Sequence, residues 1–267
     1  LISVQLLGCL PRNLPPSEAM IQLAERHTET YDALFTRLSE EYGRTIVAGS
    51  HPRFMDGQLM NVASVFFPGM PPVHQPKVHL TPAERNLWQF QPGQEINVID
   101  SSFGRFAVLI CYDVQFPETA RFLCEAGTEL LVVPYLTDDR RGYGRVTTCA
   151  RARAIENQVY VVTAGMVGSL PLMPSLTAQY AQSGIYTPSD FAFPPEGIAT
   201  EASANTEMTI VADLDLAILD RVRTSGSVLN HADAATDALH IQFDGELKIY
   251  DRRSPLEQPP VPPLSCS

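Results

Sequence analysis

One stretch constrains the fold more than any other: residues 104–118, Gly-Arg-Phe-Ala-Val-Leu-Ile-Cys-Tyr-Asp-Val-Gln-Phe-Pro-Glu. The apolar run 106–110 predicts a buried strand that ends at Cys111. Pro117 suits the first position of a helix, and Glu118 suits its first turn. A thiol therefore lies at a sharp turn between a strand and a helix. Such a turn can project a nucleophile beside free backbone N–H groups. A cysteine there could equally be a small buried apolar residue.

Apolar strands and amphipathic helices alternate on both sides of this stretch, which predicts an α/β layered domain. Residues 1–250 are expected to form one domain, and the Pro-rich residues 251–267 a mobile tail. Helices are expected at 17–42, after Pro117, at 145–157 and at 214–222, and residues 81–93 are expected to form a loop. Strands are expected at 45–48, 59–67, 73–80, 95–100, 106–110, 129–133, 159–164, 183–187 and 208–212.

Charge and cysteine usage narrow the classes of partner. The formal net charge is −11 and no long basic run occurs, which argues against nucleic acid and anionic membranes as partners. Five scattered cysteines without a Cys-x-x-Cys pair argue against a disulfide framework and a zinc site, and favour a reducing, cytoplasmic location. The chain has seventeen arginines but two lysines, so Lys77 is a candidate for a role that needs a compact ammonium group.

Three motifs occur in order: Lys-Val-His-Leu-Thr-Pro-Ala-Glu at 77–84, the stretch at 104–118, and Arg-Ala-Arg-Ala-Ile-Glu-Asn-Gln at 151–158. Together they resemble the nitrilase (carbon–nitrogen hydrolase) superfamily over roughly residues 46–216. Residues 138–143 and 186–191 look closer to the branch often fused to an acetyltransferase domain, and no such domain is among these residues.

The resemblance implies a four-layer α-β-β-α sandwich that forms a homodimer or larger assembly. It also implies hydrolysis of a small amide, N-carbamoyl compound or nitrile, with no metal or cofactor. By the same resemblance, Cys111 is the nucleophile, and Lys77 stabilises the oxyanion together with the backbone N–H of Tyr112. Glu84 supports Lys77 and the substrate. Candidates for substrate binding are Tyr112, Tyr135 and Thr137.

The sequence departs from the family at one point. The family's base is a glutamate after the first strand, before the first long helix, and residues 1–16 contain no glutamate. Either the sequence begins just after that residue, with the first strand missing, or the protein lacks its base and acts as a catalytically impaired binding or scaffold protein. The first alternative is favoured, because losing a central strand would leave the backbone of its neighbour unpaired.

A Cys-His hydrolase is a third hypothesis, since His51, His74 and His79 are available. No local signature accompanies these histidines. On one strand, His74 and His79 would point to opposite faces, which also argues against a metal site. The Gly-x-Ser-x-Gly turn of serine hydrolases is absent from the sequence.

Overall fold

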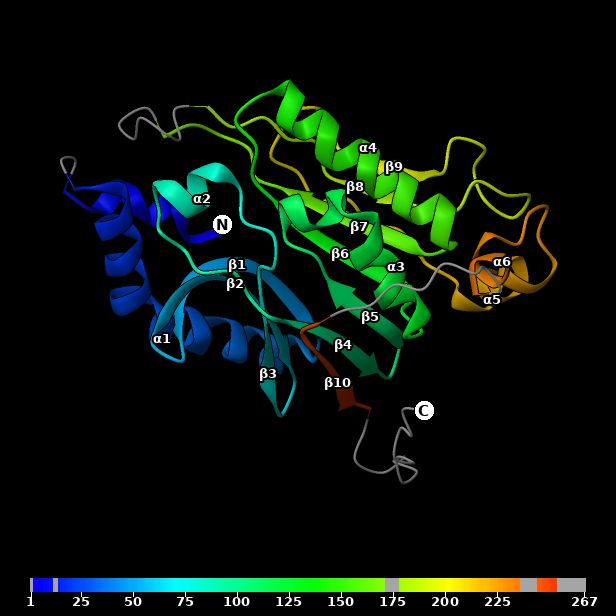
Figure 1. Ribbon diagram of the computed structural model, residues 1–267, viewed down its shortest axis with the longest axis horizontal. Helices are drawn as coiled ribbons and strands as arrows, with labels where there is room; N and C mark the ends of the chain where they lie inside the picture. The colour runs from blue at the N-terminus through cyan, green and yellow to red at the C-terminus, as the bar shows by residue number, and fades with distance from the viewer. Residues whose placement is uncertain (1, 12–13, 171–177, 236–243, 254–267) are drawn as a thin grey trace.

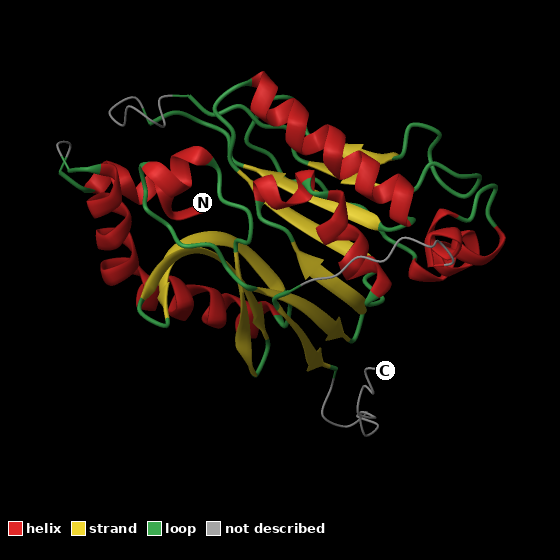
Figure 2. Cartoon of the chain, viewed as in Figure 1, coloured by secondary structure: helices red, strands yellow, loops and turns green. Residues whose placement is uncertain are grey.

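The computed structural model describes residues 2–11, 14–170, 178–235 and 244–253, which form two β-sheets between helices (Figures 1 and 2). The first sheet is antiparallel, in the order β1 (Ile46–Met55), β2 (Gln58–Phe67) and β3 (Met70–Pro76). Its outer face is covered by α1 (Pro16–Tyr42). Tyr31 packs there against Ala48 and Phe66, and its hydroxyl donates to the Ala48 carbonyl.

The second sheet has seven strands in the order β10-β4-β5-β6-β7-β8-β9. Strands β5, β6 and β7 are parallel, and β10 is parallel to β4 at one edge. Helices α3 (Pro117–Glu125) and α4 (Arg140–Asn157) cover its outer face. The strands are β4 (Glu95–Ser101), β5 (Gly104–Val108), β6 (Leu130–Tyr135), β7 (Tyr160–Gly165), β8 (Gly184–Tyr186), β9 (Ile198–Glu201) and β10 (Glu246–Arg252).

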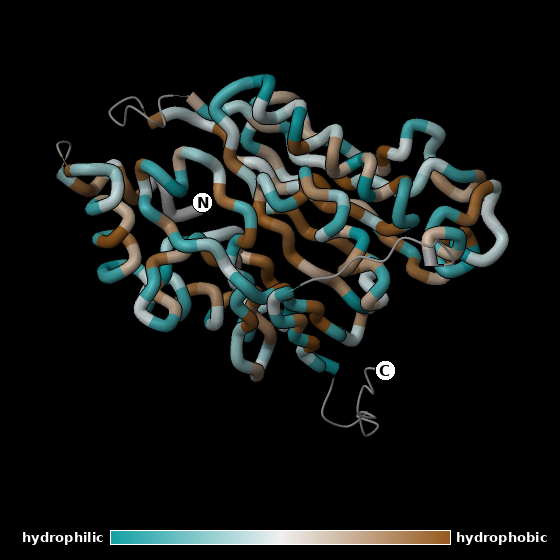
Figure 3. The backbone as a smooth tube through the Cα atoms, viewed as in Figure 1, coloured by the Kyte–Doolittle hydropathy of each residue, from teal (hydrophilic) through white to brown (hydrophobic). Residues whose placement is uncertain are grey.

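The inner faces of the two sheets share an apolar core. Val65 and Phe67 of the first sheet pack in one cluster with Ile99, Phe106 and Val108 of the second. The central strands of the second sheet are the most hydrophobic part of the trace in Figure 3. Continuous apolar runs are expected in strands whose two faces are both buried. The expected α-β-β-α sandwich is therefore confirmed.

The edge of the first sheet has one notable feature. Among the described residues, β1 pairs with β2 and no strand pairs with its other edge. The chain begins in a 3₁₀ helix, η1 (Ile2–Cys9), whose Leu7 joins a core cluster with Leu23, Leu59 and Trp88. The β1 edge therefore presents backbone groups with no strand partner in the described chain.

Two expectations near the site were wrong. Lys77 was expected within a strand at 73–80, but β3 ends at Pro76. The Lys77 N–H still bonds the Asn61 carbonyl of β2, and the chain bends at residues 78 and 79. Residues 81–93 were expected to form a loop, but they contain α2 (Pro82–Asn86). That helix begins with a capping box between Thr81 and Glu84, a signal that the sequence contained.

The expectations for the last third were less accurate. A strand expected at 208–212 does not form, and β9 pairs with β8 instead after a turn at Gly197. Helix α5 (Leu216–Ser225) forms near the expected position, and α6 (Asn230–Ala235) and β10 were not expected. Residues 251 and 252 belong to β10 rather than to the expected tail. Residues 254–267 lie outside the described part of the chain.

Candidate active site

The turn after β5 places Cys111 in a left-handed backbone conformation, with φ of 52°. Residues 110–116, which we call the nucleophile turn, pass through the 3₁₀ helix η2 (Cys111–Gln115), and α3 follows at Pro117. This conformation costs an L-residue about 1 kcal/mol. Packing and hydrogen bonds must therefore hold Cys111 there. Its thiol is half-buried, with Sγ 3.7 Å from the carbonyl oxygen of Leu136.

Arg153 of α4 supports the nucleophile turn from the side of the helices. Its guanidinium donates to the carbonyl oxygens of Val114, at 3.0 Å, and Gln115, at 3.3 Å. The same group pairs with Glu156, three residues further along α4, at 2.6 Å. Arg153 is buried and belongs to the third sequence motif, so this motif stabilises the turn that carries Cys111.

Lys77 and Glu84 form a buried ion pair beside the nucleophile turn. The Lys77 Nζ lies 2.6 Å from Oε2 of Glu84, and both residues are at most 3% exposed. The same oxygen accepts from the backbone N–H and the hydroxyl of Thr81, each at 2.9 Å. The other carboxylate oxygen accepts from Asn61 Nδ2 at 2.8 Å. Glu84 is therefore held by four donors, and it fixes the ammonium of Lys77.

Charge keeps both members of this pair ionised. Burial alone would lower the pKa of Lys77, but the charge and hydrogen bond of Glu84 outweigh burial and raise that pKa above its ordinary value. Burial would likewise raise the pKa of Glu84, yet Lys77 and the bound donors hold it below the usual range. The site thus contains a fixed ammonium group near the thiol at neutral pH.

A cavity of about 780 Å³ opens on this arrangement. All six predicted site residues contribute to its lining: Lys77, Glu84, Cys111, Tyr112, Tyr135 and Thr137. Sequence reasoning missed Asn61 and Trp88, which also line it. A polar Asn61 inside the apolar run of β2 was the signal that could have revealed it, because a buried amide in a strand needs a partner. The exposed Asp138 and Arg145 lie at the cavity as well.

Two of the three candidates for substrate binding have their hydroxyl groups engaged by backbone. The Tyr135 hydroxyl donates to the Gln182 carbonyl, at 2.9 Å, and accepts from the Gln182 N–H at 3.0 Å. The Thr137 hydroxyl donates to the carbonyl oxygen of Tyr180 at 2.7 Å. These hydroxyls connect β6 and the residues after it to 180–182, so both residues offer the cavity chiefly apolar surface. The ring of Tyr112 meets Phe116 edge-on.

The three histidines of the Cys-His hypothesis do not line the cavity. His51 is fully buried, stacks on Tyr31 and faces the Thr28 hydroxyl at 3.0 Å. The ring of His74 lies 2.9 Å from the Ser64 hydroxyl. His79 faces a carboxylate outside the cavity. A histidine base for Cys111 therefore has no support from this geometry.

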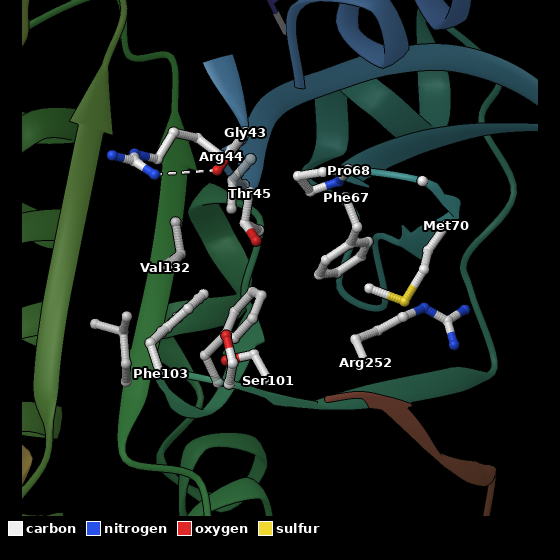
Figure 4. A pocket seen from close by; sticks show the side chains of 15 residues that line it. Gly43, Arg44, Thr45, Phe67, Pro68, Met70, Ser101, Phe103, Val132 and Arg252 are labelled. Atoms are coloured by element: carbon white, nitrogen blue, oxygen red, sulfur yellow. Dashed lines mark hydrogen bonds between the residues drawn. The ribbon is translucent and has the colours of Figure 1, made fainter. Parts of the chain in front are cut away.

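A second cavity, of about 700 Å³, lies between the two sheets and is lined by residues of β1, β2 and β3 on one side and of β4, β5 and β6 on the other. Figure 4 shows Phe67 and Met70 of the first sheet opposite Val132 of the second. Its walls are mostly apolar, and Arg44 and Arg252 lie at its rim. It contains no cysteine and no lysine, so it is not the candidate active site.

The described residues contain no cluster of three or more His, Cys, Asp or Glu side chains arranged to hold a metal ion. None of their helices is long and apolar enough to cross a membrane.

The model of one family, described as carbon-nitrogen hydrolase, matches residues 9–224 of the sequence. The chain belongs to the carbon–nitrogen hydrolase family. Among curated relatives, it is 40% identical to "Probable hydrolase YhcX" of Bacillus subtilis over 243 residues. That match covers 91% of this chain but 47% of the relative, so the chain spans about half the length of that protein. "Omega-amidase NIT2-A" of Xenopus laevis is 29% identical over 76% of this chain and 72% of its own.

Solved structures of carbon–nitrogen hydrolases have the same fold. The NitFhit protein of C. elegans superposes with a TM-score of 0.70 and 25% identity over 85% of this chain and 55% of that one. Nit3 of Saccharomyces cerevisiae, described as a member of the nitrilase superfamily, superposes with a TM-score of 0.63 and 27% identity over 73% of this chain and 69% of its own. The match to the family model, together with these folds, establishes the family of this chain.

Proposed function

We propose that this protein hydrolyses a small amide or a related non-peptide C–N bond through covalent attack by Cys111. The observation that carries the proposal is the shared cavity of Cys111, Lys77 and Glu84, in which the ammonium is fixed by the 2.6 Å ion pair. The similarity to omega-amidases supports an amide rather than a nitrile as the first substrate to test. N-carbamoyl compounds and nitriles are the substrates to test after amides.

In the first step, the Cys111 thiolate attacks the amide carbon and a C–S bond forms. The electron pair of the C=O bond moves to oxygen, where the Lys77 ammonium and the backbone N–H of Tyr112 stabilise the negative charge. The C–N bond of the tetrahedral intermediate then breaks, and the nitrogen leaves as the amine, with the proton that the Cys111 thiol gave up when it ionised. A thioester on Cys111 results. Removing one oxyanion donor costs about 100-fold or more in rate, so Lys77 should be indispensable.

In the second step, water attacks the thioester and releases the carboxylic acid and the thiol, which requires a base. The family resemblance implies a glutamate ahead of the first long helix, and residues 1–16 have none. An impaired member that binds amides without turnover is the alternative.

One mass-spectrometry experiment separates these proposals. The chain of 267 residues and its Cys111→Ala variant are each incubated with a panel of small amides. We expect an acyl adduct on Cys111 in the first protein and none in the variant. Amide hydrolysis that survives Cys111→Ala would refute the proposed nucleophile. Binding of amides with neither an adduct nor hydrolysis would favour the scaffold alternative.

We also propose a homodimer or larger homo-oligomer and a cytoplasmic location. The resemblance supports the first. The second is supported by the four described cysteines, all of which are free thiols. Sedimentation equilibrium of the purified protein tests the assembly, and a monomer at micromolar concentration would contradict it.

A further inference from the structure

A buried carboxylate joins two segments of the candidate active site without reaching its cavity. Asp113 is 2% exposed and lies in the nucleophile turn. Its Oδ2 accepts from the N–H of Ile110 at 3.1 Å, and its Oδ1 accepts from the N–H of His79 at 2.7 Å. Ile110 directly precedes Cys111, and His79 follows Lys77 by two residues. One carboxylate thus connects the segment carrying the thiol to the segment carrying the ammonium.

The side chain of His79 completes this connection. Its ring Nδ1 lies 3.0 Å from Oδ1 of Asp113, so Nδ1–H is the donor to the carboxylate. The ring also stacks on Phe116, with 3.6 Å between centroids and 9° between planes. Phe116 donates its N–H to the Asp113 carbonyl at 3.2 Å, which closes the cluster. Asp113, His79 and Phe116 are absent from the lining of the 780 Å³ cavity.

The nucleophile turn needs such a support for two reasons. Cys111 has an unfavourable left-handed conformation, and Ile110 before it has no polar side chain with which to stabilise the turn. Cys111 and Lys77 also come from segments that are distant in the sequence. His79 and Asp113, which join these segments, are 34 positions apart. A displacement of about 1 Å between reacting groups can cost about 100-fold in rate. The carboxylate of Asp113, with the stacking of His79 on Phe116, spans both segments.

We propose that Asp113 and His79 are positioning residues, which together hold the Cys111 thiol and the Lys77 ammonium in register for attack and oxyanion stabilisation. The inference rests on the proposed function. Neither residue touches the substrate. Their effect should therefore appear in steps that need the thiol and the ammonium simultaneously, and not in steps that need the thiol alone.

The test compares two reactions of Cys111 in wild type and Asp113→Asn. This substitution keeps the size of the side chain but removes the charge and turns an amide NH₂ toward an N–H donor. We expect the acylation rate with an amide substrate to fall about 10- to 100-fold, with KM changed less than about twofold. Methyl methanethiosulfonate transfers a methylthio group to Sγ and releases methanesulfinate without forming a carbonyl oxyanion. Its rate at Cys111, located by peptide mass analysis, should change less than about threefold.

A matched control and a second pair of variants complete the design. Asp190 also accepts backbone N–H groups from two segments, at Phe191 and Ser227, and lies outside the cavity lining. Asp190→Asn should leave both rates unchanged. His79→Ala should slow acylation about tenfold, and His79→Asn, whose Nδ2 can replace the ring donor, should restore most of that loss. This pair tests the inference even if Asp113→Asn does not fold.

The outcomes separate the inference from the proposed function. If wild type is acylated and Asp113→Asn is acylated equally fast, the inference alone is refuted. It is also refuted if acylation and methylthiolation fall by the same factor, because that pattern indicates a general loss of structure. If methyl methanethiosulfonate modifies Cys111 in wild type but no amide or related compound acylates it, the proposed function fails and the inference fails with it.

Discussion

Replacing Glu84 with glutamine is expected to destabilise the fold far more than an ordinary ion-pair substitution. Glu84 is 3% exposed and Lys77 is 2% exposed, so the variant leaves a buried ammonium without its counter-charge. Breaking a buried pair in this way costs about 3–5 kcal/mol. With a urea m-value of about 2 kcal/mol/M, the unfolding midpoint should fall by about 2 M. Removing both charges in Lys77→Met/Glu84→Gln should recover at least half of that loss.

Urea denaturation followed by circular dichroism measures these midpoints, and amide hydrolysis is measured on the same samples. Both variants should lose activity about 100-fold or more, because each disturbs the ammonium. Glu156→Gln is the control: its pair with Arg153 has the same 2.6 Å length, but the Glu156 side chain is 37% exposed, and its loss should cost less than about 1 kcal/mol. A double variant no more stable than Glu84→Gln would refute the reasoning.

The remaining predictions concern stability. Burial, followed by Arg53, lowers the pKa of His51 to about 4, and the same causes lower that of His74 to about 4. As the pH falls, the histidines of the unfolded chain therefore take up protons before those of the folded chain. The free energy of unfolding should fall as the pH drops from about 6.5 to 4, by up to about 3 kcal/mol for each histidine. A urea midpoint that stays constant over that range would contradict this. At Gly165 an added Cβ would lie 2.4 Å from the Tyr135 ring, so Gly165→Ala should cost about 1–3 kcal/mol. Gly144→Ala, where nothing lies within 4 Å, should instead raise the melting temperature slightly.

The parts of the fold that the sequence predicted are those with local, self-contained signals. The long helix ending at Gly43, which has φ of 59°, and the β4–β5 hairpin formed close to their expected positions. The strand, turn and helix around Cys111 also formed as expected, since the apolar run and Pro117 define both ends. The first two family motifs supplied Lys77, Glu84, Cys111 and Tyr112, and the end of the following strand supplied Tyr135 and Thr137. All six predicted residues line one cavity, although their chemical roles stay predictions.

The parts that were missed depend on contacts between distant segments. Strand β10 forms by pairing with β4, about 150 residues earlier in the chain. The apolar pattern of β10 alone was too short to predict a strand. The strand expected at 208–212 has suitable residues but pairs with no strand of either described sheet. The hydroxyl of Tyr135 could not be assigned from sequence, because its partner Gln182 comes from another segment. The sequence likewise could not predict that Asp113 accepts a hydrogen bond from His79, which lies in another segment.

The geometry of the ion pair has a consequence for the choice of lysine. An ammonium directs its N–H bonds to the corners of a tetrahedron, and Glu84 occupies one of them. The two remaining N–H bonds of Lys77 can point to the Cys111 sulfur and to the carbonyl oxygen of the substrate as negative charge moves from the first to the second in the proposed reaction. The N–H bonds of a planar guanidinium all lie in one plane, so they could not point to the carboxylate, the sulfur and the oxygen in three different directions. A chain that uses arginine almost everywhere else has reason to use lysine at position 77.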